Sequence, residues 1–410
     1  MNILFLTIGS MKNLDGNGLY IDLINELKDR GNNVYMVCPN ERRNGQGTVQ
    51  ERKEKINVLR VHTGNITKTN LLEKGISTVL IEYQFIKAIK RYYGNIKFDI
   101  VLYTTPPVTF EKVISYIKNK DNCLSYLILK DIFPQNAVDL EIMSKNSLVF
   151  KYFRLKEKKL YAISDFIGCT SKGNIEYVVK KNHEIDYSKM ELFPNSIRPR
   201  QLKDRRLERH VLRQKYDIPK DAIVFVYGGN IGKPQGIEFI KEVLKRTNEY
   251  RELFIMILGS GTHYLELLNF AIDLKSENVK VISSIPQEEY WEFLSCCDVG
   301  LIFLDRRFTV PNTPARLTYY MESALPILAA TDKNTDIKEI LSEAKCGHWI
   351  ESGDIEGYLE HIELLLKDES RRKELGKNGR LYLERNYTLD KNYEKLIKHH
   401  KDWRKNNVQE

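Results

Sequence analysis

A positively charged side chain stands at the start of a predicted helix in the stretch VPNTPARLTYYMESALPILA, residues 310–329. Thr313 suits the cap of that helix and Pro314 its first position, so Arg316 falls in the first turn. Free N–H groups and the positive end of the helix dipole already lie there, and a cation is unfavourable unless an anion sits opposite. Arg316 is therefore either a solvated arginine or part of an anion site, for which phosphate is the best match.

Three other loops in the same half of the chain follow strand-like runs. The first, GGNIGKPQG (228–236), places glycines, Asn230 and Lys233 before a helix, which favours either close approach to a phosphate or a tight turn. The loops GSG (259–261) and SSIP (283–286) are either simple turns or positions where the backbone lies against the flat base of a nucleotide. Together with Arg316 they favour a nucleoside diphosphate. The residues that would contact it in these loops are Gly229, Asn230, Gly259, Ser260, Gly261 and Ser284.

The first half of the chain offers a glycine-rich turn and a carboxylate. Gly16 and Gly18 lie in the turn DGNG after the first strand-like run. Asp131 ends the run LSYLILKD, where it either caps a loop or accepts a proton from a hydroxyl group. Lys130 could pair with Asp131 or contact phosphate, although alternation along a strand opposes both side chains pointing the same way.

The sequence contains no D-x-D motif and no His, Asp or Cys cluster with metal-ligand spacing. We therefore expect no metal and no cofactor, and the charge of a leaving diphosphate would be met by Lys, Arg and N–H groups. The six cysteines include no C-x-x-C pair, which favours a reducing cytoplasm.

Apolar strand-like runs alternate with amphipathic helical stretches in both halves, which predicts an α/β fold with parallel sheets. The polar segment 197–210 interrupts this pattern, so we expect an N-terminal domain over 1–198, a C-terminal domain over 199–390 and a final helix within 391–410 that packs back toward the first domain. Two doubly wound domains would place ligands in a cleft at the carboxyl ends of their strands. The predicted strands lie within 2–9, 33–39, 99–107, 124–134, 165–171, 190–196, 222–232, 253–261, 279–286, 299–304 and 325–330.

The net charge of +9 lies entirely in the first half. Residues 1–198 hold 30 Lys and Arg against 21 Asp and Glu, whereas residues 199–410 hold 34 of each. Nucleic acid, an acidic membrane surface and a phosphorylated acceptor are all compatible with this excess. No run of about 18–20 apolar residues is present, so no membrane span is expected.

Two segments of the first half, 76–93 and 148–161, interleave aromatic and aliphatic residues with lysine and arginine. Such helices are typical of interfacial contact with an anionic membrane. The alternative is that their apolar faces pack on the domain's own sheet while the lysines are merely solvated.

Several of these motifs, in the order YTTPP, LKDIFPQNAVDL, YGGNIGKPQG, ILGSG, SSIPQEEYWEFLSCCDVGLIFL and TPARLTYYMESALPILA, resemble glycosyltransferase family 4. The first two are similar to the branch of fucosamine and related capsular and O-antigen transferases. The resemblance implies the GT-B fold, two Rossmann-like domains with a cleft, and metal-independent transfer of a sugar from a nucleoside diphosphate sugar with retention.

The resemblance also assigns roles to residues. Arg316 falls on the family's phosphate-binding lysine, and Lys233 could replace a charge missing from the loop 228–236. The family's two glutamates fall on Pro311 and Tyr319, so both are lost, and Glu322 lies one helical turn further on. Gly16 and Gly18 would approach the sugar phosphate. Asp131 stands where many members have a histidine near the reacting centre.

These inferences predict Asp131, Arg316 and Lys233 as catalytic residues, with Pro314, Tyr319 and Glu322 among the residues that bind the donor. The expected donor is a UDP-linked N-acetylated hexosamine or deoxyhexosamine, and the expected acceptor is a saccharide on a polyprenyl diphosphate. We expect no nucleic acid partner and a peripheral position at the inner face of a bacterial cell membrane. Alternatives are a non-catalytic nucleotide-sugar-binding subunit and a nucleotide-sugar 2-epimerase.

Overall fold

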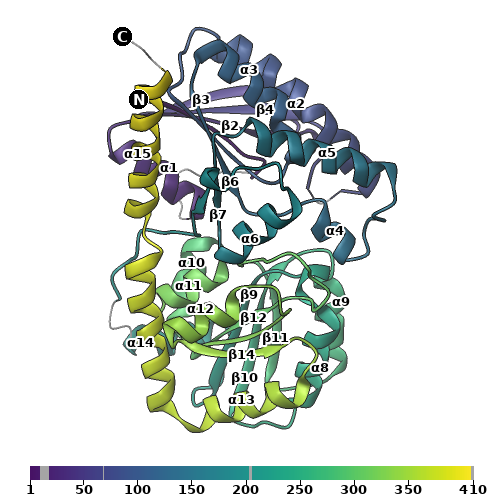
Figure 1. Ribbon diagram of the computed structural model, residues 1–410. Helices are drawn as coiled ribbons and strands as arrows, with labels where there is room; N and C mark the ends of the chain where they lie inside the picture. The colour runs from purple at the N-terminus through teal and green to yellow at the C-terminus, as the bar shows by residue number, and fades with distance from the viewer. Residues whose placement is uncertain (10–17, 68, 203–205, 408–410) are drawn as a thin grey trace. The chain divides into compact units, whose positions relative to one another are not determined.

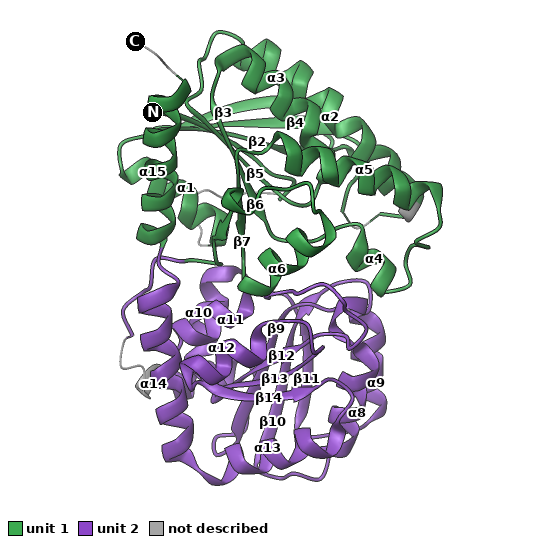
Figure 2. Ribbon diagram, in the orientation of Figure 1, with its two compact units in different colours: residues 1–196, 389–410 green, residues 197–388 purple. Residues whose placement is uncertain are grey.

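The chain folds into two compact units, each built from a largely parallel sheet and flanking helices (Figure 2). The computed structural model describes residues 1–9, 18–67, 69–202 and 206–407. Unit 1 comprises residues 1–196 and 389–410, and unit 2 comprises residues 197–388. The predicted α/β class with two Rossmann-like domains is confirmed.

Unit 1 has an eight-stranded sheet with the order β3-β4-β2-β1-β5-β6-β7-β8. All neighbouring strands are parallel except β3 and β4, which pair antiparallel. The strand order changes direction between β1 and β5, which makes their carboxyl ends the switch point of a doubly wound sheet. The strands are β1 (Asn2–Leu6), β2 (Asn33–Glu41), β3 (Val49–Lys53), β4 (Ile56–Thr63), β5 (Ile100–Thr104), β6 (Leu124–Leu129), β7 (Phe166–Cys169) and β8 (Met190–Leu192).

Helices cover both faces of this sheet (Figure 1). On one face α1 and α15 pack together, and their leucines share a core with alternate residues of β1. On the other face α2, α3 and α5 contact one another or the short helix η2 (Val108–Phe110). The helices are α1 (Leu19–Asp29), α2 (Leu71–Tyr93), α3 (Glu111–Asp121), α4 (Gln135–Asp139), α5 (Leu148–Ile163), α6 (Lys172–Lys181) and α15 (Leu389–Asn407).

Unit 2 has a six-stranded, fully parallel sheet with the order β11-β10-β9-β12-β13-β14. Its switch point lies between β9 and β12. The strands are β9 (Ile223–Asn230), β10 (Leu253–Ser260), β11 (Val279–Ser283), β12 (Val299–Phe303), β13 (Ile327–Thr331) and β14 (Gly347–Glu351). The helices are α7 (Arg206–Lys215), α8 (Ile237–Arg246), α9 (Tyr264–Asp273), α10 (Gln287–Leu294), α11 (Arg316–Glu322), α12 (Ile337–Ala344), α13 (Ile355–Lys367) and α14 (Glu369–Asn386).

Two local expectations need correction. The helix predicted to start at Thr313 and Pro314 begins instead at Arg316, and Ala315 at its cap position makes no side-chain hydrogen bond. The strands β3, β4 and β14 were absent from the predicted set, because their residues are more polar or more exposed than those of the central strands. None of the described helices is long and apolar enough to cross a membrane.

Candidate active site

A cavity of about 480 Å³ opens in unit 2 beside the carboxyl ends of β9 and β10. These strands are adjacent and parallel, so Gly229 lies opposite Gly259, and Gly259 lies opposite Ser283 of β11. The loops after the three strands consequently meet at one edge of the sheet. The cavity is lined by Gly228, Gly229, Asn230, Leu258, Gly259, Ser260, Ser284, Ile285, Gln287, Tyr290, Ala315, Arg316 and Tyr319.

The structure thus brings together seven of the residues predicted from sequence. They come from the last residues of β9 and β10, from the loop after β11 and from α11, and they share this one cavity although they lie up to 90 positions apart. The seven are Gly229, Asn230, Gly259, Ser260, Ser284, Arg316 and Tyr319.

Arg316 is the charged group of the cavity. Its side chain lies at the first position of α11 and is only 8% exposed. The guanidinium carbon lies 4.1 Å from the centroid of the Tyr227 ring, which stabilises the cation through its π face. Nη1 is buried and has no hydrogen-bond partner among the described residues. A buried cation with an unused donor is costly unless an anion binds it, so Arg316 is suited to an anionic ligand.

Two glycines allow the backbone to come close to this guanidinium. Gly229 has φ +131, and a Cβ atom there would lie 3.1 Å from Nη2 of Arg316. A Cβ atom on Gly259 would lie 1.9 Å from the carbonyl oxygen of Gly229. Neither position accepts a side chain without movement, so the wall beside Arg316 is made of backbone.

Tyrosine side chains support the cavity from inside the unit. The Tyr320 hydroxyl donates to the carbonyl of Val226 at 3.1 Å and accepts from the amide of Gly228 at 3.2 Å. Burial raises the pKa of Tyr320 to about 12, although the nearby Arg316 charge opposes that shift. Tyr319 lies on the cavity wall, where its hydroxyl accepts a 2.9 Å hydrogen bond from Gln287 Nε2.

Asn230 shapes the first loop. Its Nδ2 donates to Gln235 Oε1 at 2.9 Å, and the same oxygen accepts from the amide of Gly232 at 3.1 Å. The carbonyl of Asn230 accepts from the Tyr227 hydroxyl at 2.6 Å. Asn230 therefore holds the glycine-rich loop in place and also lines the cavity.

Four predicted residues of unit 2 do not line this cavity. Gly261 forms the turn after β10, where a Cβ atom would lie 2.2 Å from the carbonyl oxygen of Ile231. Pro314 precedes α11, and its carbonyl accepts from the amide of Leu317 at 3.1 Å. The other two, Lys233 and Glu322, have different surroundings.

Lys233 lines a second cavity of about 580 Å³, together with Asp305, Arg306 and Arg307. There Arg307 holds both carboxylate oxygens of Asp305, at 2.9 and 2.8 Å. Glu322 is 2% exposed, and its Oε1 accepts from the amide of Arg200 at 3.0 Å. Glu322 thus anchors the segment that enters unit 2. Because it does not line the cavity, it does not take the place of either glutamate of the resembling family.

The candidate acid–base residues of unit 1 follow β6. The amides of Lys130 and Asp131 donate to Thr105 Oγ1 at 3.0 and 3.3 Å, which fixes this turn against the end of β5. Burial raises the pKa of Asp131, and the charges of Lys130 and Lys74 oppose that shift. A carboxylate with a raised pKa is a better proton acceptor, which fits the predicted role.

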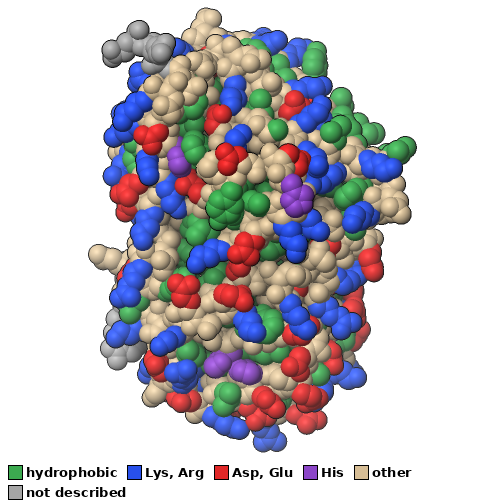
Figure 3. Space-filling view, in the orientation of Figure 1, with side chains coloured by type: hydrophobic (Ala, Val, Ile, Leu, Met, Phe, Trp, Pro, Cys, Tyr) green, Lys and Arg blue, Asp and Glu red, His purple; other side chains and the backbone are tan. Residues whose placement is uncertain are grey.

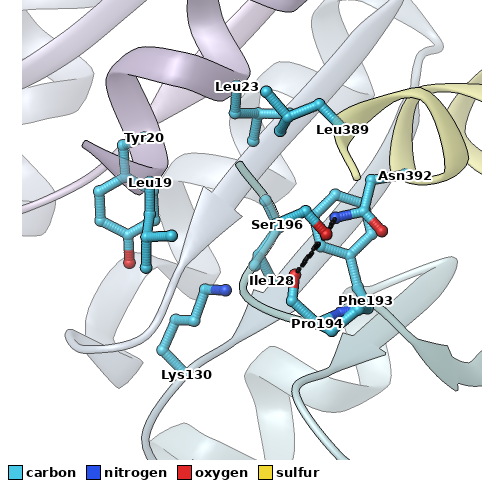
Figure 4. A pocket seen from close by; sticks show the side chains of 10 residues that line it. All are labelled: Leu19, Tyr20, Leu23, Ile128, Lys130, Phe193, Pro194, Ser196, Leu389 and Asn392. Atoms are coloured by element: carbon cyan, nitrogen blue, oxygen red, sulfur yellow. Dashed lines mark hydrogen bonds between the residues drawn. The ribbon is translucent and has the colours of Figure 1, made fainter. Parts of the chain in front are cut away.

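Lys130 points into a small space of about 10 Å³ at the end of β6 (Figure 4). Tyr20 lies on one side of it, and Ser196 and Asn392 lie on the other. The Lys130 ammonium donates to Asn195 Oδ1 at 2.7 Å. Burial lowers the pKa of Lys130 to about 7, and the Asp131 carboxylate acts in the opposite direction. Gly18 precedes α1 in the same unit, whereas Gly16 lies outside the described residues.

Sequence reasoning missed Tyr227, Gln287 and Tyr290. Tyr227 begins the motif YGGNIGKPQG, and Gln287 and Tyr290 lie within SSIPQEEYWEFLSCCDVGLIFL, but nothing in either motif marks these side chains as part of a site. Across the part of the chain that the structure describes, no three His, Cys, Asp or Glu side chains form a group that could hold a metal ion.

Comparison with known proteins finds a family model that matches within unit 2. Residues 208–382 match the family described as glycosyl transferases group 1. Over 285 residues, 68% of each chain, the sequence is 22% identical to the probable glycosyltransferase WbjE of Pseudomonas aeruginosa.

Solved structures agree on the fold. The glycosyltransferase WaaG, involved in lipopolysaccharide biosynthesis, aligns with a TM-score of 0.70 at 14% identity, covering 96% of this chain and 99% of WaaG. Anabaena Alr3699/HepE in complex with UDP-glucose aligns with a TM-score of 0.70 at 12% identity, covering 98% of this chain and 100% of HepE. The fold is GT-B, and together with the family match it supports a glycosyltransferase.

Proposed function

From the premise that residues 208–382 match the glycosyl transferases group 1, we propose that this protein transfers a sugar from a UDP-linked donor to a lipid-linked saccharide. The proposed sugar is an N-acetylated hexosamine or deoxyhexosamine, and the product belongs to bacterial surface polysaccharide. The neighbour WaaG, which acts in lipopolysaccharide biosynthesis, and the complex of HepE with UDP-glucose support this proposal.

The observation that carries the proposal is the buried guanidinium of Arg316 beside a wall of backbone. Its unpartnered Nη1 and the amides of the glycine loops supply donors for a diphosphate. The cavity of about 480 Å³ lies within the range of small-ligand sites. Its apolar residues, Leu258 and Ile285, offer surfaces for a nucleoside ring.

In the proposed reaction the bond between the anomeric carbon and the diphosphate oxygen breaks, and UDP leaves with the electron pair. The acceptor hydroxyl oxygen forms the new glycosidic bond on the same face of the sugar. Its proton goes to Asp131 or to the departing phosphate. Arg316 stabilises the negative charge that develops on the diphosphate, which is the role that a divalent cation plays in other transferases.

The acceptor in this proposal is a saccharide on a polyprenyl diphosphate, so the protein works at the inner face of the cell membrane. The excess of lysine and arginine in residues 1–198 supports an anionic acceptor or surface. A non-catalytic donor-binding subunit is the second candidate, because Pro311 and Tyr319 replace the two glutamates usual in the resembling family.

A turnover assay distinguishes the candidates. The purified protein is incubated with UDP-N-acetylhexosamines and a lipid-linked saccharide, and UDP release and the acceptor mass are followed. Release of UDP that depends on the acceptor, with an acceptor heavier by one sugar, is the expected result. Tight UDP binding without release would identify a binding subunit, and conversion of the donor without acceptor would identify an epimerase.

A further inference from the structure

The exposed apolar side chains of unit 1 gather on two neighbouring helices. Of the 19 large hydrophobic residues exposed in the described part of the chain, nine lie on α2 and α5. In Figure 3 apolar side chains stand out along the upper right edge, where Figure 1 draws these helices. The nine are Leu72, Ile76, Val79, Leu80, Tyr83, Leu148, Val149, Tyr152 and Leu155, and we call them the apolar face.

The apolar face is separate from the stripes that pack on the sheet. Ile81, Phe85, Ala88 and Ile89 of α2 are buried, and at 3.6 residues per turn they point on average about half a turn away from Leu72, Ile76 and Tyr83. The α2 members of the apolar face are 43% to 75% exposed, and the α5 members are 37% to 82% exposed. The helices therefore pack against the interior of unit 1 and still present apolar side chains to solvent.

Basic side chains continue this face. Lys87 and Lys90 are exposed and follow the apolar stripe of α2 at helical spacing, and Lys151 and Lys159 are exposed beside that of α5. None of the carboxylates of α2 and α5 pairs with these four lysines. Glu82 and Glu157 are buried, and Glu73 accepts from Arg42 at 2.7 Å. The outer surface of both helices is thus apolar and positively charged.

A buried ion pair holds the two helices together. Lys156 of α5 donates to Glu82 of α2 at 3.0 Å and to Glu111 of α3 at 3.3 Å. Thr109 in η2 adds a 2.9 Å hydrogen bond to the carbonyl of Thr78 in α2. The two helices, and with them their exposed apolar side chains, are therefore held in a fixed arrangement.

We propose that the apolar face and its lysines form a docking surface for an anionic lipid bilayer. Leucine, isoleucine and tyrosine side chains enter the boundary between headgroups and acyl chains, and the lysines contact lipid phosphates. The proposal deepens the proposed function, because it supplies the surface on which a lipid-linked acceptor is met. A bilayer fits better than a protein partner, since the face combines apolar residues with positive charge only.

Vesicle binding tests the proposal with the full chain. Sedimentation with vesicles of phosphatidylglycerol and phosphatidylcholine is compared with vesicles of phosphatidylcholine alone, at low and high salt. The wild-type protein is expected to bind the anionic vesicles, more weakly at high salt. The Ile76→Ser/Leu80→Ser and Leu148→Ser/Leu155→Ser variants should each bind at least about tenfold more weakly. The Lys87→Gln/Lys90→Gln variant should lose about fivefold for each lysine.

Matched controls come from unit 2. Leu265 and Ile272 of α9 are exposed to a similar extent, at 68% and 62%, so Leu265→Ser/Ile272→Ser should leave vesicle binding unchanged. UDP binding is measured on every variant. Lost vesicle binding with unchanged UDP binding supports the docking surface.

Two results would overturn the docking surface. Wild-type protein that binds neither kind of vesicle would do so, whether or not it binds UDP. A concentration-dependent dimer that the α2 and α5 variants dissociate, without vesicle binding, would show that a second copy covers the face. The proposed function fails separately, through absence of UDP-sugar binding or turnover.

Discussion

The guanidinium of Arg316 lies over the ring of Tyr227, its Cζ atom 4.1 Å from the ring centroid. The contact joins the first residue of α11 to β9, so it places the charge beside the glycine pair at the switch point of unit 2. Because Tyr227 is an uncharged partner, the cation stays available to an anionic ligand.

Replacing Arg316 tests this arrangement. Arg316→Ala is expected to lower kcat/KM for the UDP-sugar by about 10²–10³, because the charge on the leaving diphosphate loses its main partner. Arg316→Lys should recover part of that loss, since an amine keeps the charge but not the planar fork. Steady-state kinetics with circular dichroism as the folding control measure this, and near-normal turnover in a folded Arg316→Ala variant would reject the assignment.

Lys233 is expected to matter less than Arg316. It lines the cavity that contains Asp305 and Arg307, not the one that contains Arg316. Lys233→Ala should therefore lower kcat/KM in the direction predicted from sequence, but by less than about tenfold. A loss as large as that of Arg316→Ala would mean that the loop 231–236 moves toward the donor during the reaction.

Gly229 should tolerate no side chain. Gly229→Ala places Cβ 3.1 Å from Arg316 Nη2 at φ +131, so we expect weaker UDP binding and a loss of stability of about 1–3 kcal/mol. Gly45→Ala is the matched control, because φ is +70 there but no atom lies within 4 Å of the added Cβ. Calorimetric titration with UDP and thermal unfolding of both variants separate backbone strain from displacement of Arg316. Unchanged UDP affinity in Gly229→Ala would contradict the close approach.

Transfer activity should survive excess EDTA. The sequence lacks D-x-D, and the proposed diphosphate site uses Arg316 and backbone amides. The assay compares initial rates with EDTA, with added Mg²⁺ and with added Mn²⁺ after chelation. A rate that vanishes in EDTA and returns with either ion would require a metal site in the donor complex.

Lys130 should make the stability of unit 1 depend on pH. Its pKa is lowered by burial from 10.5 to about 7, so above pH 7 the folded chain holds a neutral amine while the unfolded chain holds a charged one. Unfolding then takes up a proton, and stability rises with pH from 7 to 10 by up to about 1.4 kcal/mol per pH unit. Below pH 7 both states are charged and this dependence ends.

Urea unfolding measures the effect through Trp403, the only tryptophan of unit 1, in a background in which Trp291 and Trp349 are phenylalanine. Lys130→Met should remove the rise between pH 7 and 10 and leave the remaining pH dependence in place. Equal slopes in the two proteins would show that Lys130 titrates normally in the folded chain.

The central strands and the glycine loops could be predicted because parallel central strands are buried on both faces. The runs at 222–232, 253–261 and 299–304 contain β9, β10 and β12, whose central residues are all buried. The edge strand β14 was missed, because Gly347, His348 and Trp349 are half-buried and leave no continuous apolar run.

The details of the site depend on packing that a sequence does not encode locally. The position of Arg316 at a helix start predicts an anion beside it, but the sequence does not predict the contact with the Tyr227 ring. These residues are 89 positions apart, and they meet only because of the strand order in the sheet. Similarly, Glu322 and Tyr319 lie on one short helix, yet Tyr319 lines the cavity and Glu322 accepts from the Arg200 amide. Helical spacing alone does not say which face of α11 meets the ligand.

Because the last helix, α15, belongs to unit 1, the cores of the two units become complete at different stages of translation. Leu389 and Leu396 of α15 are buried in the core of unit 1, and Asn392 Nδ2 donates to Ser196 Oγ at 3.0 Å. Unit 2 is one continuous segment, so it can fold completely once residue 388 has left the exit tunnel. Unit 1 is synthesised first but lacks part of its core until α15 emerges. We therefore expect the core of unit 2 to be completed before that of unit 1, which reverses the usual N-terminal-first order of domain folding.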